Sequence, residues 1–189
     1  MIYYDVKIEK QKFIEKIKRE GYFKEQVILS SGKSSDYYFD LRRVTLTPEG
    51  AYLSALLILD AVKDDLIDAI GGPTLGADPM VGAISVLSMQ MGRPMNSFII
   101  RKTPKKHGRQ QLIEGPFLKS GSRVILIDDV ATSGKAFLES IDVLRHQDLE
   151  IVKAVCLIDR EEGAAEALAK KDCPMVSIIK ASEIHKVSV

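Results

Sequence analysis

Residues 124–136 constrain the fold of this chain more than any other stretch. Four branched apolar residues in succession, at 124–127, predict a strand buried on both faces, as in a parallel sheet. Asp128, Asp129 and a run of small residues follow, and we expect them to end the strand abruptly. From Gly134 the apolar residues return at helical spacing, at Phe137, Leu138, Ile141 and Leu144. The stretch therefore predicts a strand-to-helix loop at the edge where open α/β sheets bind ligands.

The loop contains two kinds of polar group that suit different parts of one ligand. Unpaired backbone N–H groups at a helix N-terminus can bind phosphate, and the hydroxyls of Thr132 and Ser133 would add donors. The carboxylates of Asp128 and Asp129 would repel that phosphate, so they suit sugar hydroxyls or a bridging cation. Together these groups predict a sugar-phosphate site. The alternative without a ligand is a polar strand end followed by a helix cap.

Two common nucleotide-binding motifs do not fit the sequence. A Walker A loop requires Ser or Thr after Gly-Lys, and here Ala136 follows Gly134 and Lys135. The glycines at residues 71–76 also lack the spacing of the dinucleotide-binding motif. These mismatches argue against both classes of nucleotide site.

Strand and helix patterns alternate along the chain. Helices are predicted at residues 7–20, 47–62, 79–90, from 134 onward, and at 161–170. Strands are predicted at residues 27–29, 37–41, 69–72, 97–100, 124–127, 151–158 and 176–179. This alternation predicts an α/β fold with a parallel sheet flanked by helices, in a single domain over residues 1–189. The two strands that precede the alternation could form a separate small cap, mainly within residues 1–45.

Charge and cysteine content exclude several functional classes. A net charge of +1 gives no general attraction to nucleic acid or to a membrane. Cys156 and Cys173 lack the spacing of a metal site or a disulfide framework, and we expect both to be buried as small apolar residues. Residues 1–10 lack the apolar core of a signal peptide, and the longest apolar run, 51–61, is too short to span a bilayer. A cytoplasmic location is therefore expected.

A basic segment at residues 101–109 combines arginines and lysines with His107. It follows a predicted strand at the same sheet edge as Asp128, and Pro104 and Gly108 could act as hinges of a movable lid. Such a lid could neutralise a diphosphate leaving group. The alternative is a solvated run of charge without a ligand.

The 124–136 stretch resembles the ribose-phosphate-binding motif of the type I phosphoribosyltransferases, in which a hydrophobic strand, two acids and a Thr-x-Gly-like loop open a helix. This family transfers phosphoribose from 5-phosphoribosyl 1-diphosphate (PRPP). The resemblance implies that Asp128 and Asp129 bind the ribose hydroxyls and act in catalysis. It implies that the loop at 131–136 holds the 5-phosphate. The PRPP contacts implied in this stretch are Asp128, Asp129, Val130, Ala131, Thr132, Ser133, Gly134, Lys135 and Ala136.

The pattern Arg-Lys-x-x-Lys-x-His-Gly at residues 101–108 resembles, more narrowly, the catalytic loop of the orotate phosphoribosyltransferases. The resemblance implies that Arg101, Lys102, Lys105 and His107 contact PRPP, chiefly its diphosphate. Lys105 and His107 are the implied catalytic residues of this loop. In that family the loop reaches the active site of the partner subunit, so a homodimer is implied, with the 102–115 loop completing the partner's site.

Residues 30–40 are similar to the hood of the same family, where a Ser-Gly-x-x-Ser-x-x-aromatic-aromatic pattern covers the base. Tyr38 and Phe39 fall at the aromatic positions, although a paired aromatic strand can also be simple core. Arg160 follows a strand at the position that binds the orotate carboxylate, and a guanidinium can hold a carboxylate with two hydrogen bonds. Thr132 is the other implied orotate contact.

Two positions depart from many family members. Ser30 and Leu75 stand where lysines that bind diphosphate are often found, and Lys33 could compensate for the first. The resemblance implies a reaction that depends on Mg²⁺, with the ion held mainly through the substrate and no metal ligands assigned to the protein. The implied product is orotidine 5′-phosphate, formed in pyrimidine (UMP) biosynthesis. The alternatives are a uracil or purine phosphoribosyltransferase, and a PRPP-binding regulator, for which no DNA-binding segment is evident.

Overall fold

The computed structural model of the chain describes residues 4–28, 34–103 and 112–185. Its helices are α1 (Val6–Glu20), α2 (Arg42–Thr45), α3 (Pro48–Ala61), α4 (Asp78–Gln90), α5 (Lys135–Arg145), α6 (Ala164–Ala169) and α7 (Ala181–His185). Its strands are β1 (Tyr22–Phe23), β2 (Val27–Ile28), β3 (Ser34–Ser35), β4 (Tyr38–Phe39), β5 (Ala69–Pro73), β6 (Asn96–Ile100), β7 (Ile113–Glu114), β8 (Arg123–Ala131), β9 (Glu150–Asp159) and β10 (Met175–Lys180). Except for the short elements α2, β1, β3, β7 and α7, each corresponds to a predicted helix or strand.

Six of the strands form one sheet in the order β10-β9-β8-β5-β6-β7. The pairs from β10 to β6 are parallel, and only β7 runs antiparallel to its neighbour. The predicted parallel sheet flanked by helices is therefore confirmed. The sequence gives no signal for β7 because this strand has two residues and lies in a polar segment.

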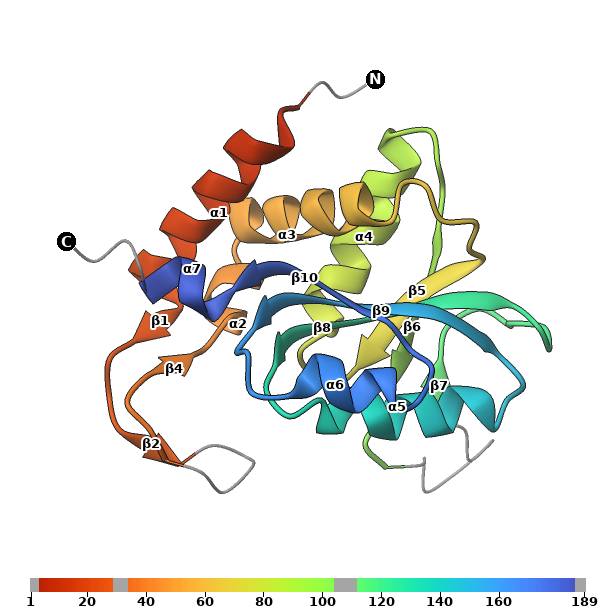
Figure 1. The fold of residues 1–189 in the computed structure, drawn as a ribbon. Coiled ribbons are helices and arrows are strands. Elements are labelled where there is room, and N and C mark those ends of the chain that lie inside the picture. The colour runs from red at the N-terminus through yellow and green to blue at the C-terminus, as the bar shows by residue number, and fades with distance from the viewer. Residues whose placement is uncertain (1–3, 29–33, 104–111, 186–189) are drawn as a thin grey trace.

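The sheet separates two hydrophobic cores (Figure 1). On β8, Ile125 and Ile127 face the core covered by α1, α3 and α4, whereas Val124 and Leu126 face the core covered by α5 and α6. Both faces of this strand are therefore dry, which explains why its apolar run has no polar alternation. Cys156 and Cys173 are buried in the second core, as predicted.

Strand β8 extends further than predicted. The acids do not end it, because parallel pairing with β9 continues through Asp128, Val130 and Ala131. The prediction of an abrupt stop after residue 127 is therefore wrong: backbone hydrogen bonding to β9 outweighs the polar side chains. The strand instead presents the two acids from its own carboxyl end, and the loop begins at Thr132.

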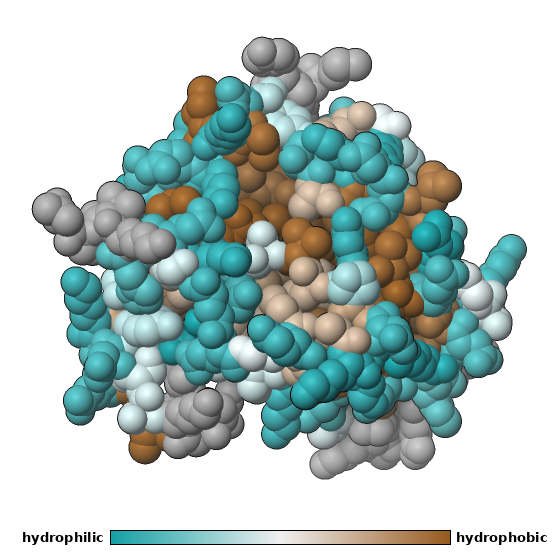
Figure 2. Space-filling view, in the orientation of Figure 1, coloured by the Kyte–Doolittle hydropathy of each residue, from teal (hydrophilic) through white to brown (hydrophobic). Residues whose placement is uncertain are grey.

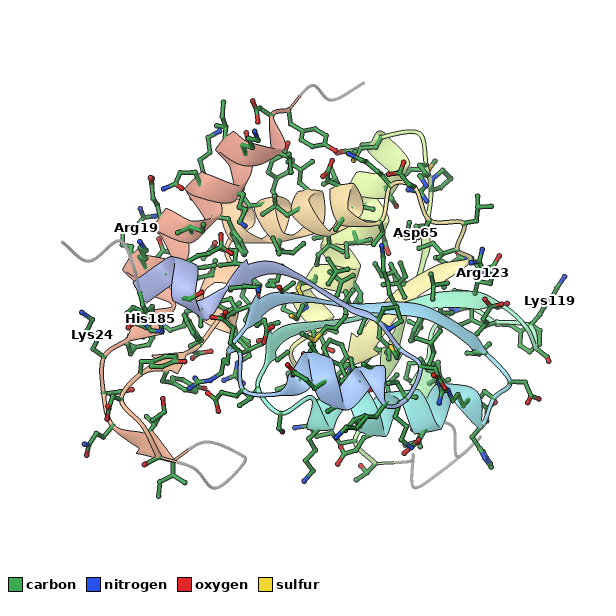
Figure 3. The ribbon with its side chains drawn as sticks, viewed as in Figure 1. Arg19, Lys24, Asp65, Lys119, Arg123 and His185 are labelled. Atoms are coloured by element: carbon green, nitrogen blue, oxygen red, sulfur yellow. The ribbon has the colours of Figure 1, made fainter. Side chains whose placement is uncertain are left out.

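The hood consists of two separate strand pairs. The sequence predicts that residues 27–29 and 37–41 form two strands around one turn, but β4 pairs with β1 and β2 pairs with β3. The rings of Tyr22 and Phe39 pack 5.3 Å apart, which favours the β1–β4 pairing. Helix α7 ends beside these strands at His185 (Figure 3). The C-terminal helix thus supports the N-terminal hood.

The visible surface in the orientation of Figure 1 is hydrophilic around its rim and shows hydrophobic residues nearer its middle (Figure 2). Within residues 4–28, 34–103 and 112–185, no helix combines the length and apolar character that a membrane crossing requires.

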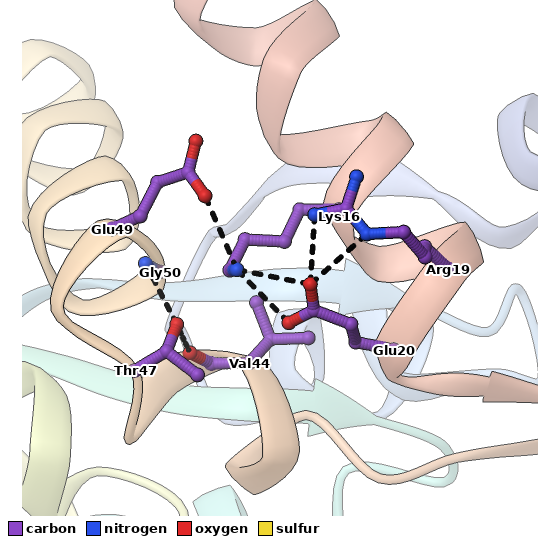
Figure 4. Close-up of polar contacts among 7 residues, drawn as sticks. All are labelled: Lys16, Arg19, Glu20, Val44, Thr47, Glu49 and Gly50. Atoms are coloured by element: carbon purple, nitrogen blue, oxygen red, sulfur yellow. Dashed lines mark hydrogen bonds and ion pairs between the residues drawn. The ribbon is translucent and has the colours of Figure 1, made fainter.

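Helices α1 and α3 are joined by a buried lysine (Figure 4). Lys16 is only 6% exposed, and its Nζ lies 2.9 Å from Glu20 Oε2 and 3.2 Å from Glu49 Oε2. Two carboxylates thus compensate for the burial of one ammonium group. Just before Glu49, the hydroxyl of Thr47 caps α3 by accepting a hydrogen bond from the N–H of Gly50, at 3.1 Å. This cap confirms the predicted start of the helix.

Gly50 gives the first testable prediction. A Cβ atom at this position would lie 2.0 Å from the carbonyl oxygen of Val44, which is backbone and cannot rotate away. Gly50→Ala is therefore expected to lower the free energy of unfolding by about 2–4 kcal/mol, measured by chemical denaturation. The matched control is Gly82→Ala in α4, where nothing lies within 4 Å and alanine should stabilise by about 0.5–1 kcal/mol. If both substitutions changed the free energy of unfolding equally, the close contact between Gly50 and the backbone of Val44 would be contradicted.

Candidate active site

A cleft of about 730 Å³ opens at the carboxyl ends of the parallel strands. It lies where the strand order reverses, since the chain passes from β5 to β6 on one side and from β8 to β9 on the other. Such switch points are the usual ligand sites of open α/β sheets. The predicted site residues that line the cleft are Tyr38, Phe39, Arg101, Lys102, Asp128, Asp129, Val130, Thr132, Ala136 and Arg160.

The acid pair at the end of β8 is held by backbone groups. Asp128 Oδ1 accepts from the N–H of Asp129 at 3.0 Å, and Asp129 Oδ1 accepts from the N–H of Val130 at 2.8 Å. Burial, followed by the charge of Asp129, raises the pKa of Asp128 well above its usual range. Burial also raises the pKa of Asp129, and the positive charge of Arg42 opposes that rise. Hydroxyl donors or a cation would stabilise the charged forms of these two adjacent carboxylates.

The loop after β5 approaches the acid pair closely. A Cβ atom at Gly76 would lie 2.1 Å from Asp128 Oδ1 and 2.6 Å from Asp129 Oδ1. Only glycine therefore leaves room for both carboxylates. Leu75, 60% exposed, lines the same cleft. The backbone of this loop is available to a ligand even though Leu75 offers no charge.

The predicted phosphate loop forms a smaller pocket beside the main cleft. This pocket has a volume of about 80 Å³ and is lined by residues 128 and 130–137. Gly134 precedes α5 with a φ of 78°, a conformation that glycine adopts without strain. The free N–H groups at the start of α5 border this pocket. Its size and position suit a phosphate at the end of a ligand that also reaches Asp128.

Residues of the hood also line the cleft. Tyr38 lines the cleft and is half-buried, whereas Phe39 is 5% exposed and also belongs to the first core. Both interpretations of the aromatic pair thus apply to Phe39, which lines the cleft and packs against Tyr22. Tyr37 does not line the cleft. Its ring instead lies beneath the Arg160 guanidinium, 4.3 Å from Cζ.

Arg160 is buried at the end of β9 and lines the cleft. Its backbone N–H donates to the carbonyl of Ala131 at 2.9 Å, which ties it to the start of the phosphate loop. Its Nε donates to Glu162 Oε1 at 2.7 Å, and Nη2 donates to Ser35 Oγ at 2.9 Å. A buried guanidinium with a fixed orientation is suited to recognise an anionic group on a flat ligand.

The basic segment is described only at its start. Arg101 and Lys102 line the cleft, and Arg101 also pairs with Glu114, with Nη1 3.5 Å from Oε1. The positive charge of Lys102 opposes the upward pKa shift of Asp128. The predicted catalytic residues Lys105 and His107 lie outside the described residues, as does Ser30.

Sequence reasoning missed two features of the cleft. Arg42 lines it and is held by Asp40, with Nε 3.1 Å from Oδ1. A signal was present, since Arg42 follows the hood motif by two residues. Gly76 was noted only as part of a glycine-containing loop, and its contact with the acids depends on sheet order. Among residues 4–28, 34–103 and 112–185, no group of three or more His, Cys, Asp or Glu side chains could hold a metal ion.

Comparison with known proteins finds similarity in both sequence and structure. The profile of the phosphoribosyl transferase domain matches residues 78–187. Orotate phosphoribosyltransferase of Bradyrhizobium diazoefficiens is 39% identical over 178 residues, which are 93% of this chain and 95% of that protein. A crystal structure of Mycobacterium tuberculosis orotate phosphoribosyltransferase with Fe(III) dicitrate matches with a TM-score of 0.82 at 34% identity, covering 93% of this chain and 98% of that one. The PRPP complex of the same enzyme matches with a TM-score of 0.78 at 30% identity, covering 94% and 99%.

Proposed function

This chain belongs to the orotate phosphoribosyltransferases, and we propose that its cleft holds PRPP along the acid pair and the phosphate loop, with orotate beneath the hood. The enzyme transfers the phosphoribosyl group of PRPP to orotate, which gives orotidine 5′-phosphate and diphosphate in pyrimidine biosynthesis. One observation supports this placement most strongly. The main cleft and the phosphate-sized pocket beside it bring together buried Asp128, half-buried Asp129 and a buried arginine about 30 residues further along the chain.

The proposed work of the enzyme is positioning and charge stabilisation. The carboxylates of Asp128 and Asp129 accept hydrogen bonds from the ribose hydroxyls, and the loop at 131–136 holds the 5-phosphate through backbone N–H groups. As the bond to diphosphate breaks, positive charge develops on the ribose, and N1 of orotate forms the new bond at the same carbon. N1 loses its proton in this step, and the departing diphosphate can take it up. The two nearby carboxylates stabilise that charge. No covalent intermediate with the protein is required.

The proposed cationic partners of the diphosphate are Arg101 and Lys102 at the rim of the cleft. Arg42 faces the same cleft, and its charge acts on Asp129. It can supply positive charge in a protein that has Ser30 and Leu75 where relatives often have lysines. Lys105 and His107 are proposed, from the sequence pattern, as the groups that contact the diphosphate in the transition state.

Magnesium is the proposed cofactor. When bound, Mg²⁺ would neutralise charge on the diphosphate and so favour its departure. The donor set fits this role, because the crowded carboxylates of Asp128 and Asp129 would be stabilised by a nearby cation. Mg²⁺ keeps several water or substrate oxygens and needs few protein ligands. Substrate oxygens are therefore its main proposed ligands, with the acid pair nearby.

Arg160 supports orotate as the base. Orotate carries a carboxylate that uracil lacks, and the guanidinium offers further N–H groups toward the cleft beyond those that contact Glu162 and Ser35. Thr132, at the start of the phosphate loop, is the other proposed orotate contact. A uracil or purine enzyme would have no use for a buried cation at this position.

The test of this function is turnover with identified products. PRPP, orotate and Mg²⁺ should give one orotidine 5′-phosphate and one diphosphate for each orotate consumed, measured by chromatography and mass spectrometry. Removal of Mg²⁺ by EDTA should stop the reaction, and added Mg²⁺ should restore it. Binding of PRPP without consumption would favour the regulator instead. Full activity in EDTA would contradict the proposed cofactor alone.

A homodimer in which the 102–115 loop completes the partner's site is also proposed, and complementation can test it. Lys105→Ala and Asp128→Asn should each be nearly inactive alone. A mixed dimer has one subunit with an intact acid pair that receives an intact loop from its partner, so mixing should restore roughly 25–50% of wild-type activity per mixed dimer. The control takes Lys105→Ala alone through the same mixing procedure, and it should stay inactive. Failure to complement, with mixed dimers shown by mass spectrometry, would mean that the loop serves its own subunit.

A further inference from the structure

The Arg160 guanidinium is held by groups that do not themselves line the cleft. Nε donates to Glu162 at 2.7 Å, Nη2 donates to the Ser35 hydroxyl at 2.9 Å, and the ring of Tyr37 lies 4.3 Å from Cζ. The side chain of Arg160 is only 2% exposed. Neither Ser35 nor Tyr37 lines the cleft. Two hood residues therefore contact the cation without lining the cleft themselves.

The Ser35 hydroxyl joins these contacts into one unit. It accepts from Arg160 Nη2 and donates to the carbonyl of Tyr37 at 2.9 Å. A serine hydroxyl has a single hydrogen, so donation to Tyr37 directs its lone pairs toward the cation. In this arrangement the Ser35 oxygen acts as an acceptor for the guanidinium, which has only donors. Movement of the Tyr37 backbone would disturb the hydrogen bond as well as the ring contact.

The Tyr37 ring is itself fixed from behind. It makes an edge contact with the His185 ring at 4.4 Å between centroids and with Phe39 at 5.5 Å. Nδ1 of His185 lies 3.0 Å from the hydroxyl of Tyr22, so α7 and β1 hold the histidine in place (Figure 3). Among the described residues, the Tyr37 hydroxyl has no hydrogen-bond partner. The face of the ring, rather than the hydroxyl, is therefore the functional part.

We propose that Tyr37 is a positioning residue for orotate selection: its ring and the Ser35 hydroxyl fix the plane of the Arg160 guanidinium for the orotate carboxylate. This inference rests on the proposed role of Arg160. A planar guanidinium makes two parallel hydrogen bonds to a carboxylate only in one orientation, and a mobile arginine would lose rotamer freedom at each binding event. The ring reduces that loss through a cation–π contact. The hood thus acts on the base through the arginine.

The first test compares variants of Tyr37. Tyr37→Leu removes the ring and should raise KM for orotate about 10-fold, with kcat changed by less than about 3-fold and the Kd for PRPP unchanged. Tyr37→Phe keeps the ring and should restore most of the wild-type KM. The matched control is Tyr52→Leu, an exposed tyrosine on α3 outside the cleft. An unchanged orotate KM in Tyr37→Leu, or equal losses in orotate and PRPP binding, would overturn the inference.

A double-mutant cycle tests whether Tyr37 changes the orotate KM through Arg160. If Tyr37 acts through Arg160, Tyr37→Leu should cause no further rise in orotate KM when Arg160 is already alanine. Independent, multiplicative effects would overturn the inference. If Tyr37→Leu fails to fold, Ser35→Ala takes its place, with an expected rise of about 3- to 10-fold and the same cycle. If the wild-type enzyme itself did not turn over orotate, the proposed function would be refuted. Failure of the function and failure of the Tyr37 inference are therefore distinguishable.

Discussion

Asp128→Asn is expected to reduce kcat/KM for PRPP by about 100- to 1,000-fold while making the folded protein more stable. The loss of activity follows from the proposed role of the acid. Asparagine keeps an acceptor oxygen but loses the negative charge that strengthens the hydrogen bonds to ribose hydroxyls. It also removes half of the charge that stabilises the developing positive ribose.

The gain in stability follows from the surroundings of Asp128. The side chain is 7% exposed and adjoins Asp129, and burial raises its pKa above the value in the unfolded chain. The folded state therefore binds this proton more tightly. The resulting stabilisation is fully present below the ordinary carboxyl pKa and is lost as pH rises through the raised pKa. Asparagine avoids that loss and can still accept from the Asp129 N–H, which lies 3.0 Å from Oδ1.

Thermal unfolding and steady-state kinetics test both effects on the same preparations. At pH 8 the melting temperature of Asp128→Asn should exceed that of the wild type by an amount on the order of a few degrees, and the difference should shrink as pH falls toward about 4. The control is Asp64→Asn, because Asp64 is exposed outside the cleft and should change neither property. If Asp128→Asn were less stable than the wild type at pH 8, the argued cost of burying the Asp128 charge beside Asp129 would be contradicted. If its kcat/KM for PRPP were close to that of the wild type, Asp128 would have no role in the mechanism.

Arg160→Ala is expected to weaken orotate binding strongly. The variant should raise KM for orotate about 100-fold or more, because it loses the proposed bidentate contact between the buried guanidinium and the orotate carboxylate. The Kd for PRPP, measured by calorimetry, should stay within about 3-fold of the wild type, since the acid pair and the phosphate loop are untouched. Equal loss of PRPP and orotate binding would indicate that Arg160 serves the whole cleft rather than the base.

Two controls separate charge loss from other effects. Arg19→Ala removes an arginine from the surface of α1, far from the cleft, and should leave both constants unchanged (Figure 3). Arg160→Ala also leaves the Glu162 carboxylate without its 2.7 Å partner. The double variant with Glu162→Gln removes that stranded charge. If orotate binding returned in the double variant, repulsion by Glu162 would explain the loss, and direct recognition by Arg160 would be wrong.

The fold was predictable where local pattern and global packing agree. The apolar run at 124–127 predicts a doubly buried strand, and both sheet faces are indeed covered. Thr47 and Pro48 predict the start of α3 because capping is a local interaction. The pairing within the hood was not predictable in the same way. Its strands have two residues each, so tertiary contacts such as that between Tyr22 and Phe39 decide which strands meet.

The site was predictable where its residues are contiguous. Asp128 and the following loop form one segment, and the structure places that segment in a cleft with Arg160 and Tyr38. Contacts between distant segments left no sequence signal. Ser35 meets Arg160 across 125 positions, and Gly76 fits the acid pair only because β5 is the neighbour of β8. Such contacts depend on strand order and on the placement of the hood.

A competition assay tests the central claim most directly. Wild-type enzyme is incubated with PRPP, Mg²⁺ and equal concentrations of orotate, uracil, adenine and hypoxanthine, and the nucleotide products are quantified by mass spectrometry. The buried Arg160 beside the acid-pair loop predicts orotidine 5′-phosphate as the dominant product by at least about 100-fold. A dominant product from uracil or from either purine would contradict the account.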